Sequence, residues 1–252
     1  MGKVRKPLQG VLNIIKFNWH FYVIAIALSI GLNCIQYFID FPLKYFLKIS
    51  SIILLYAIVI SLFSSYYIYD FSGLYQFKWI KNNYNKNNIL NINAGFDETS
   101  ELIINRNSSA KVSVLDFYDP LKHTEVSIKR ARKAFPPLAK TISIQTNRIP
   151  IEDNSIDKIY LILSAHEIRD KKEQIQFFTE LNRVLTTSGE IFITEHLRNI
   201  PNLLAYNIGV FHFFSRSSWL NTFKNSHLKV SSELKNNPFI STFTLTKNGN
   251  SL

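Results

Sequence analysis

Two long apolar runs dominate the first third of the chain. Residues 17–39 contain no Asp, Glu, Lys or Arg, and residues 49–69 form a second run of the same kind. A bilayer core of about 30 Å needs roughly 20 helical residues, so each run is long enough to span it. Aromatic residues gather at the ends of both runs, as they do at membrane interfaces. The pattern predicts a transmembrane hairpin within residues 1–69, and the alternative is a pair of buried helices in a soluble core.

From residue 89 onward, short β-type runs alternate with helical patterns. We expect strands over residues 89–93, 111–116, 141–146, 156–163 and 189–195. Helical spacing of apolar residues marks 98–106, 124–135, 171–185 and 216–226, with Asp170 as the N-cap of the third. The last two β-type runs, 227–234 and 239–246, predict a terminal antiparallel hairpin. Strand–helix alternation predicts an α/β fold with a doubly wound parallel sheet. Residues 70–88 are then a juxtamembrane linker, and 89–252 form one domain.

The distribution of charge changes what the basic composition implies. The chain has 29 Lys and Arg against 18 Asp and Glu, a net charge of +11. Residues 1–88 carry +7 of this excess beside the predicted spans, where anionic lipids attract it, so no nucleic-acid partner is expected. The basic run 129–133 is interpreted as a solvated helix face. Basic residues flank the outer ends of the two spans more than the link between them, which predicts a multi-pass protein of the inner membrane with its large domain in the cytoplasm.

Ligands of parallel sheets bind beyond the carboxyl ends of the strands, so the candidate site lies there. His166 follows the fourth predicted strand, and Glu195 and His196 follow the fifth; histidine is the natural base near neutral pH. The histidines and acids show no H-x-x-x-H spacing, and a single cysteine cannot form a zinc knuckle, so no metal is expected. The sequence also lacks the G-x-G-x-x-G loop of an NAD-linked oxidoreductase and the G-x-S-x-G nucleophile elbow.

Two segments of the soluble part resemble motifs of a known family. Residues 149–157 read IPIEDNSID, and residues 180–189 read ELNRVLTTSG. They are similar, nearly position for position, to motifs of class I S-adenosylmethionine (SAM) methyltransferases of type 11, which commonly read Leu-Pro-Phe-x-Asp-x-Ser-Phe-Asp and Glu-Leu-x-Arg-Val-Leu-x-x-Gly-Gly. ILNINAGFDETSELI and VLDFYDP stand where that family has its glycine-rich loop and the end of its second strand. The resemblance covers residues 89–247 and implies a Rossmann-like fold. NAGFDETS and HEIRD also resemble a membrane-tethered bacterial subgroup.

The resemblance implies SAM as the cofactor and suggests which residues bind it. The family loop, Asp/Glu-x-Gly-x-Gly-x-Gly, corresponds to residues 91–97, where only Gly95 of the three glycines remains. Asparagine tolerates positive φ better than most residues, so Asn93 is a candidate substitute, whereas Asp97 is also a candidate helix cap. The ribose-binding acid of the family falls on Asp116, with Asp119 as the competing candidate. The expected cofactor-binding residues are Asn91, Asn93, Gly95, Asp97, Asp116, Gln145 and Thr146, the last two at the family's adenine contact.

These inferences predict a membrane-anchored, SAM-dependent methyltransferase. Methyl transfer from a sulfonium needs alignment, and it needs a base only when the acceptor must lose a proton. His166, Glu195 and His196 are the candidate catalytic residues. The expected partners are the lipid bilayer and a hydrophobic small-molecule or lipid-like acceptor, for which the apolar segment 197–226 is either the pocket or plain core packing. The alternative is a non-catalytic, membrane-tethered binding or scaffold protein whose SAM-binding fold has degenerated. The acceptor atom and the oligomeric state stay open.

Overall fold

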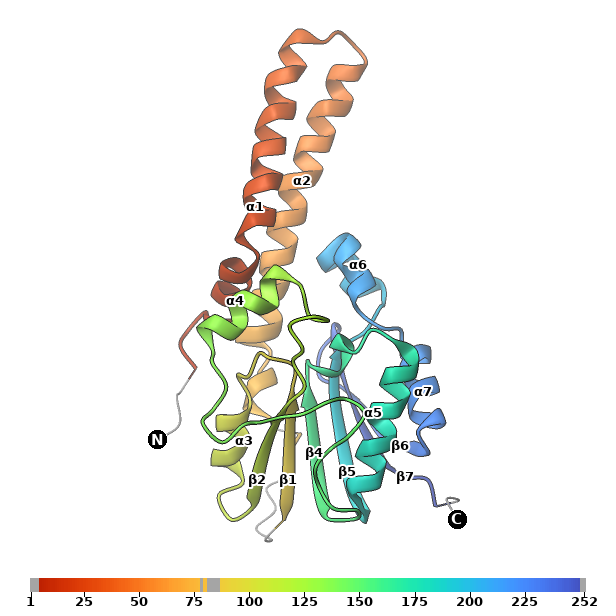
Figure 1. Cartoon of the computed structure of the whole chain (residues 1–252). Helices are drawn as coiled ribbons and strands as arrows, with labels where there is room; N and C mark the ends of the chain where they lie inside the picture. Colours follow the sequence, from red (N-terminus) through yellow and green to blue (C-terminus); the bar gives the residue numbers. More distant parts are fainter. Residues whose placement is uncertain (1–4, 78, 81–86, 250–252) are drawn as a thin grey trace.

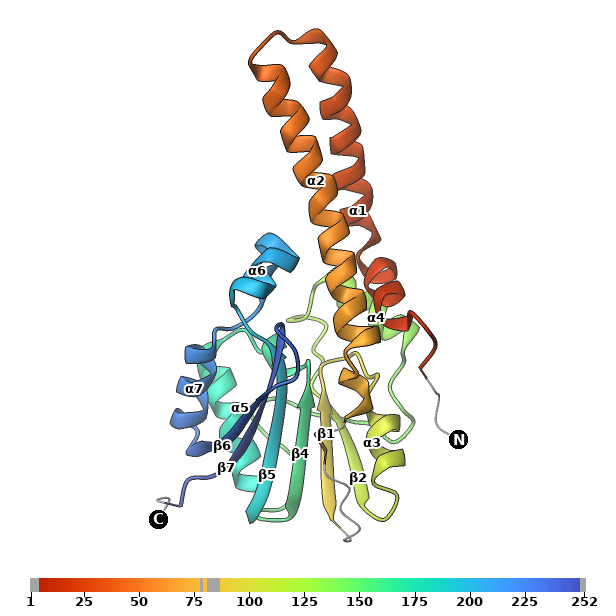
Figure 2. The same cartoon turned by 180° about the vertical axis from the view of Figure 1, so that it is seen from behind.

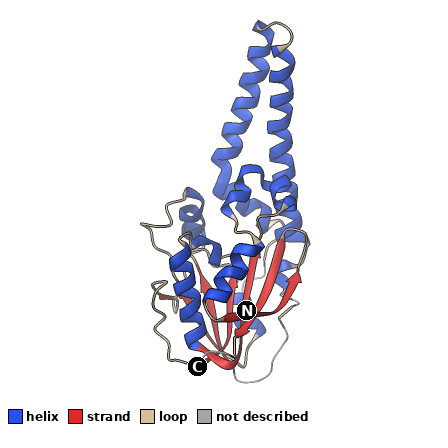
Figure 3. Cartoon of the chain, turned by 90° about the vertical axis from the view of Figure 1, so that its right-hand side faces the viewer, coloured by secondary structure: helices blue, strands red, loops and turns tan. Residues whose placement is uncertain are grey.

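The computed structural model describes residues 5–77, 79–80 and 87–249. A helical hairpin, formed by α1 (Gln9–Ile35) and α2 (Leu43–Tyr66), projects beyond the carboxyl ends of the parallel strands of a seven-stranded sheet (Figure 1). Its far end extends away from the sheet domain, as the side view shows (Figure 3). Both helices are long and apolar enough to cross a membrane, and only 11% and 6% of their apolar windows are buried. The helical hairpin is therefore not the pair of buried core helices considered as the alternative.

Each long helix ends in a short turn of another helical type, and polar side chains join the two helices. The first ends in the 3-10 turn η1 (Gln36–Phe38), and the second continues into the π-helical turn η2 (Tyr67–Phe71). Midway along the helical hairpin, Ser29 Oγ lies 2.6 Å from Ser51 Oγ, and Asn33 Nδ2 donates to Ser51 Oγ at 2.5 Å. Small serines let two helix backbones approach closely in a membrane, and their hydroxyls bond across the interface. The two helices are thus packed to each other as a unit.

The sheet has the strand order β3-β2-β1-β4-β5-β7-β6. Its strands are β1 (Asn88–Asn93), β2 (Lys111–Asp116), β3 (Ile142–Ser143), β4 (Ile156–Ile162), β5 (Leu185–His196), β6 (Leu228–Lys235) and β7 (Ile240–Lys247). Strands β1 to β5 pair in parallel, and β7 pairs antiparallel with β5 and β6. The predicted doubly wound sheet with its terminal antiparallel hairpin is confirmed. The strand expected at 141–146 shrinks to two exposed residues at the sheet edge.

Alternate strand residues face opposite sides of the sheet, and helices cover both sides. Leu90 and Ile92 of β1 belong to the main core, to which α5 (Lys171–Val184) and α7 (Arg216–Asn225) contribute (Figure 1). Ile89 packs on the other face with Ile103 of α3 (Ser100–Arg106), seen from behind in Figure 2. Asp170 caps α5 as predicted, because its Oδ1 accepts from the Glu173 N–H at 2.8 Å. Both faces of the sheet are therefore buried, as the near-continuous apolar runs require.

Two segments differ from the sequence-based expectation. Phe77 and Ile80, within the predicted juxtamembrane linker, are buried in the core of the second sheet face. The Asn/Lys-rich part of that linker, residues 81–86, lies outside the described residues. After β5, the chain forms α6 (Ile200–Tyr206) and the 3-10 helix η5 (Asn207–His212), where no helix was expected. With α4 (Val126–Ala134), α6 lies beyond the same ends of the strands as the helical hairpin (Figure 1).

Candidate active site

A cavity of about 660 Å³ lies where the helical hairpin meets the sheet domain. Its volume is within the range of small-molecule sites, about 300–1,000 Å³. Ile14, Phe17 and Tyr22 of α1 line one side, together with Ser61 of α2. The sheet domain lines the other side with residues that include Ala94, Phe96, Glu98, Leu163, His166, Glu167, His196, Tyr206, His212 and Phe213. The cavity therefore belongs jointly to the helical hairpin and to the loops at the carboxyl ends of the strands.

Glu98 fixes the start of α1 above the loop that follows β1. Its Oε2 accepts from Arg5 Nη1 at 3.0 Å and from the Tyr75 hydroxyl at 3.1 Å. Its Oε1 accepts from Gln9 Nε2 at 2.9 Å and from Asn13 Nδ2 at 2.7 Å. The side chain is 5% exposed, so four donors from the helical hairpin and its extension satisfy one nearly buried carboxylate. This carboxylate therefore joins the helical hairpin to the sheet domain at the edge of the cavity.

Two further contacts hold the helical hairpin in place. Asp70 in η2 accepts hydrogen bonds from the backbone N–H groups of Gly10 and Val11, both at 2.8 Å, and so satisfies unpaired donors at the start of α1. Arg130 of α4 donates to the Phe17 carbonyl oxygen at 2.8 Å. The orientation of the two helices over the strand ends is thus set by specific hydrogen bonds, and the wall that they give the cavity is part of the fold.

His166 and Glu195 form a buried pair at the ends of β4 and β5. His166 Nδ1 lies 2.7 Å from Glu195 Oε2, and the His166 N–H donates to Glu195 Oε1 at 3.2 Å. Burial by itself would lower the pKa of His166, but Glu195 and Glu167 raise it to about 10. At neutral pH the imidazole therefore holds its proton and presents a positive charge to the cavity. The sequence had suggested His166 as a base, which would require a neutral imidazole.

His196, the last residue of β5, is buried and neutral. Burial lowers its pKa to about 3. Asn202 Nδ2 donates to the carbonyl oxygens of Leu197 and Phe239, which orients the amide so that its Oδ1 faces His196 Nδ1 at 3.0 Å. His196 Nδ1 must then carry the proton, and Nε2 accepts a hydrogen bond from the Tyr69 hydroxyl at 2.8 Å. A hydroxyl of η2 at the cavity is thereby held in place by a neutral imidazole.

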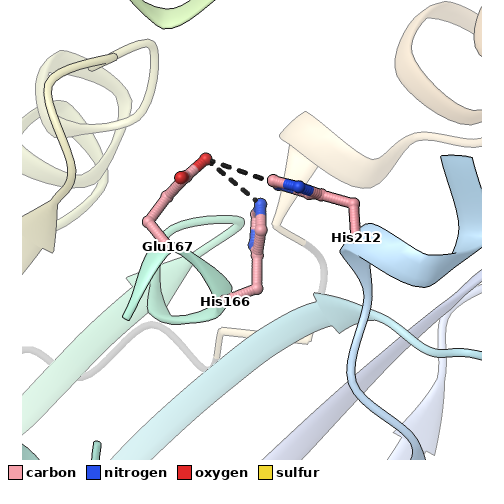
Figure 4. Close-up of side chains that lie close together, drawn as sticks. All are labelled: His166, Glu167 and His212. Carbon is pink, nitrogen blue, oxygen red and sulfur yellow. Dashed lines mark ion pairs between the residues drawn. The ribbon is translucent and has the colours of Figure 1, made fainter. Parts of the chain in front are cut away.

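Three side chains converge beside the cavity: His166, Glu167 and His212 (Figure 4). His166 Nε2 lies 3.5 Å and His212 Nε2 lies 3.7 Å from the same oxygen, Glu167 Oε1. Burial would raise the pKa of Glu167, but the two imidazoles hold it well below its usual range. No sequence spacing revealed this group, because His212 comes from η5, far along the chain.

The loop after β1 is built around Gly95, whose φ of +89° is a conformation that glycine adopts readily. Asn93 Oδ1 accepts from the Gly95 N–H at 3.2 Å. Asp97 Oδ1 accepts from two backbone N–H groups at the start of α3, at 2.9 and 3.1 Å, which is the capping role considered for it. Asn91 Nδ2 donates to two hydroxyl groups at the same helix start. Among the described residues, Asn93 Nδ2 and Asp97 Oδ2 are buried and have no hydrogen-bond partner.

Asp116 ends β2 and is held by two groups of the protein. Its Oδ2 pairs with Arg132 Nη1 at 2.5 Å, and its Oδ1 accepts from the Tyr118 N–H at 2.9 Å. The basic run 129–133 is therefore not simply a solvated face, since both of its arginines have specific partners. Asp119, the competing candidate, accepts at 2.9 Å from a backbone N–H two residues further on, and so shapes a turn.

Gln145 and Thr146 lie apart from the cavity lining. Gln145 is exposed and forms an isolated β-bridge with Arg148, and Thr146 Oγ1 donates to Glu173 Oε1 at 2.5 Å. The structure thus gathers the three candidate catalytic residues at the ends of β4 and β5, but it spreads the candidate cofactor residues over the loop after β1, the end of β2 and the region after β3.

Sequence reasoning missed the residues that come from outside the sheet. Glu167 was available as the direct neighbour of His166, and His212 stands in the aromatic segment after β5. Nothing in the sequence connects Phe17, Tyr69 or Glu98 with the site, because these contacts join segments that are far apart in the chain. These long-range contacts extend the candidate site from the strand ends to the base of the helical hairpin.

Comparisons with known proteins agree with this architecture. Residues 95–193 match the sequence profile of a family of methyltransferase domains, type 11. No curated protein sequence is significantly similar to the chain. The structure of geranyl diphosphate C-methyltransferase from Streptomyces coelicolor is similar with a TM-score of 0.50 at 11% identity, over 70% of this chain and 79% of that one. A SAM-dependent methyltransferase from Aquifex aeolicus has a TM-score of 0.49 at 15% identity, over 70% and 93%. The profile match indicates a methyltransferase domain over these residues, and the structural similarity shows the shared fold.

Proposed function

We propose that this chain is a membrane-anchored, SAM-dependent methyltransferase that modifies a lipophilic small molecule or a lipid-like acceptor. The observation that supports the proposal is the cavity shared by the helical hairpin and the sheet domain. Ligands of this fold bind at the carboxyl ends of the strands, and here those ends face apolar side chains of α1, among them Ile14, Phe17 and Phe21. An acceptor with a long apolar part would bury it against this wall, and burial contributes about 25 cal/mol per Å² of apolar surface.

The residues around Gly95 fit the amino-acid end of the cofactor. Asn93 Nδ2 is a buried donor and Asp97 Oδ2 is a buried acceptor, each without a partner among the described residues. These groups suit a carboxylate and an ammonium group respectively. Asp116 suits the two ribose hydroxyls if Arg132 gives up one carboxylate oxygen. The cofactor supplies the activated methyl group, and the protein residues bind it, orient it and exclude water.

The residues at the ends of β4 and β5 suit the handling of protons and charge. Tyr69 donates to the neutral Nε2 of His196, so the Tyr69 oxygen remains free to accept a hydrogen bond from an acceptor hydroxyl. His166, which Glu195 keeps protonated, suits an electron-rich oxygen of the acceptor. In this proposal His166 binds the acceptor and Glu195 is the counter-ion that holds His166 in position. His196, whose lowered pKa makes it a weak base, orients the Tyr69 hydroxyl.

Membrane association is supported by the helical hairpin and by α6. Large apolar side chains are exposed along both long helices, and α6, which packs near α2, exposes Ile200, Leu203 and Leu204. Exposed apolar surface of this extent is typical of a membrane or protein contact. The basic residues beside both outer ends of the helical hairpin favour a multi-pass protein of the inner membrane with its catalytic domain in the cytoplasm. This is the arrangement expected of a membrane-tethered bacterial methyltransferase.

Labelled SAM tests the proposal directly. Membranes that contain the full-length protein are incubated with the labelled cofactor, and the products are divided between an organic and an aqueous phase. We expect the label in an organic-soluble product, strongly reduced in His196→Asn and unchanged in His227→Ala, which alters an exposed histidine outside the cavity. Label that appears only in water-soluble compounds would contradict a lipophilic acceptor, and no label in any compound would contradict the enzyme.

Two observations favour the non-catalytic alternative. Tyr118 packs so closely on Gly95 that a Cβ at Gly95 would lie 2.6 Å from Tyr118 Cδ2, and Arg132 occupies the Asp116 carboxylate. A degenerate site of this kind would serve a binding or scaffold protein. Calorimetric titration of SAM into the full-length protein separates the two functions. Saturable binding is expected for the enzyme, and an absence of binding at physiological cofactor concentration would favour the scaffold.

A further inference from the structure

The three side chains that converge in Figure 4 have the chemistry and the spacing of a metal site. One ligand atom from each of His166, Glu167 and His212 lies within 4.8 Å of the other two. The imidazole Nε2 atoms lie 3.5 and 3.7 Å from Glu167 Oε1, which is long for a hydrogen bond. Ligands placed about 2.0–2.1 Å from one ion in tetrahedral geometry lie about 3.4 Å apart. The two distances to Glu167 match this spacing, and an ion fits between the three atoms if the two histidine ligand atoms, which lie within 4.8 Å of each other, are also about 3.4 Å apart.

The outer contacts of the two histidines supply a second, independent observation. Glu195 Oε2 lies 2.7 Å from His166 Nδ1, and Glu125 Oε1 lies 3.4 Å from His212 Nδ1. Histidines that bind a metal almost always donate their other N–H to such a partner, which fixes the orientation of the ring and makes it a better ligand. His166 has this arrangement, because Glu195 is at hydrogen-bond distance from its Nδ1. The partner of His212 is more distant and its side chain is 57% exposed, but both imidazoles direct Nε2 toward Glu167.

We propose that His166, Glu167 and His212 bind one divalent transition-metal ion of the zinc type. Two imidazoles and one carboxylate suit Zn²⁺ and its first-row neighbours, whereas Mg²⁺ and Ca²⁺ prefer oxygen ligands throughout. Three protein ligands leave a fourth position for water or substrate, which is typical of catalytic rather than structural zinc sites. All three residues line the cavity, so the open position is accessible from it.

The role of the ion rests on the proposed function, and it restricts the methyl acceptors that the site would prefer. With the ion bound, His166 Nε2 would bind the metal in place of its proton, and the metal would replace the imidazolium as the positive group that faces the acceptor. The metal would take an oxygen or nitrogen atom of the acceptor as its fourth ligand. The acceptor class then narrows to apolar molecules that carry such a ligand atom, for example a phenol-like or carbonyl-bearing head on an apolar body. The apolar body would lie along α1, and the bound head would lie at the strand ends.

Zinc titration of the full-length protein in detergent tests the site without cofactor or acceptor. We expect one equivalent of zinc per chain, measured by calorimetry and by metal analysis after desalting. Loss of an outer partner typically weakens metal binding about 10–100-fold, so the zinc affinity of Glu195→Gln should fall by that factor. His212→Ala and Glu167→Gln each remove a ligand and should weaken zinc binding by more than about 100-fold. His227→Ala, which changes an exposed histidine, is the matched control and should bind zinc as the unaltered protein does.

Two results would overturn the proposal. One is the absence of stoichiometric zinc binding by the unaltered protein, and the other is unchanged binding in His212→Ala. Circular dichroism of each variant shows whether it is folded. Glu195→Gln retains all three ligands, so its zinc affinity shows the effect of the outer partner without the loss of a ligand. Because the titration contains neither SAM nor acceptor, its failure would leave the proposed methyl transfer standing. Zinc binding without methyl transfer to any compound would refute the function and leave the metal site.

Discussion

Removal of the Glu98 carboxylate should uncouple the helical hairpin from the sheet domain. Four donors converge on this one side chain, from Arg5, Gln9, Asn13 and Tyr75, at 2.7–3.1 Å. Glu98→Ala leaves the Arg5 guanidinium, whose side chain is 16% exposed, without its counter-ion. Breaking a buried ion pair in this way costs about 3–5 kcal/mol, because the remaining charge stays desolvated. That is a large fraction of the roughly 5–15 kcal/mol by which native proteins are stable.

Thermal unfolding in detergent measures the effect. A loss of 1 kcal/mol lowers Tm by about 2–4 °C for chains of this size class, so Glu98→Ala should lower it by about 6–20 °C. Glu98→Gln keeps an acceptor for two of the donors but turns an amide toward Arg5. Its Tm should therefore lie between those of the unaltered protein and Glu98→Ala. Glu152→Ala removes an exposed carboxylate and should change stability by less than about 0.5 kcal/mol.

A Tm for Glu98→Ala within about 2 °C of the unaltered protein would refute this reasoning, because 3 kcal/mol cannot be lost with so small a shift. Limited proteolysis provides a second readout. If the base of α1 detaches from the loop after β1, cleavage near the start of α1 should become faster in Glu98→Ala and remain unchanged in Glu152→Ala.

Three further substitutions test other parts of the fold and site. Gly95→Ala forces an unfavourable positive φ and a clash with Tyr118, and it should destabilise the protein by about 1–3 kcal/mol, measured by urea unfolding. Asp170→Ala removes the N-cap of α5 and should cost about 1 kcal/mol in the same assay, and an unchanged midpoint would show that the cap contributes nothing. Asp116→Ala should weaken SAM binding at least about 10–100-fold in calorimetry, since even one hydrogen bond to a charged group contributes about 1.5–3 kcal/mol. Unchanged SAM affinity would move the ribose role to Asp119.

The sheet could be predicted because its information is local. Strands β1, β2, β4 and β5 are largely apolar runs whose carboxyl-terminal residues are buried on both faces. Helices with a 3.6-residue apolar period stand between them, so each element is marked within its own residues. Where the signal was ambiguous, the prediction differed from the structure. Phe77 and Ile80 stand in an aromatic stretch that fits a membrane interface equally well, and only the tertiary structure shows that they cover the sheet. The weakly apolar segment 141–146 keeps only two strand residues, at the exposed edge.

The candidate site was predicted only in part, for a related reason. His166, Glu195 and His196 follow strands, and parallel strands bring their ends together by topology, so sequence position alone located them. The cluster of His166, Glu167 and His212 depends on η5, a 3-10 segment without apolar periodicity, and no local pattern fixes where its side chains point. The protonation state of His166 could not be predicted from the sequence either, because it depends on a carboxylate 29 residues away on another strand.

The same long-range contacts change how the helical hairpin should be understood. A simple tether would need only a flexible connection, yet Asp70 caps α1, Arg130 holds the Phe17 carbonyl and Gly10 leaves no room for a side chain, since a Cβ there would lie 2.3 Å from Tyr69 Cβ. Helices held this firmly form a wall of the site. A fragment without residues 1–69 would lose that wall and the Tyr69 hydroxyl that pairs with His196. It would also lose every donor to Glu98 except Tyr75. It should therefore fail to methylate even where the sheet domain still folds, so activity must be measured on the full-length chain.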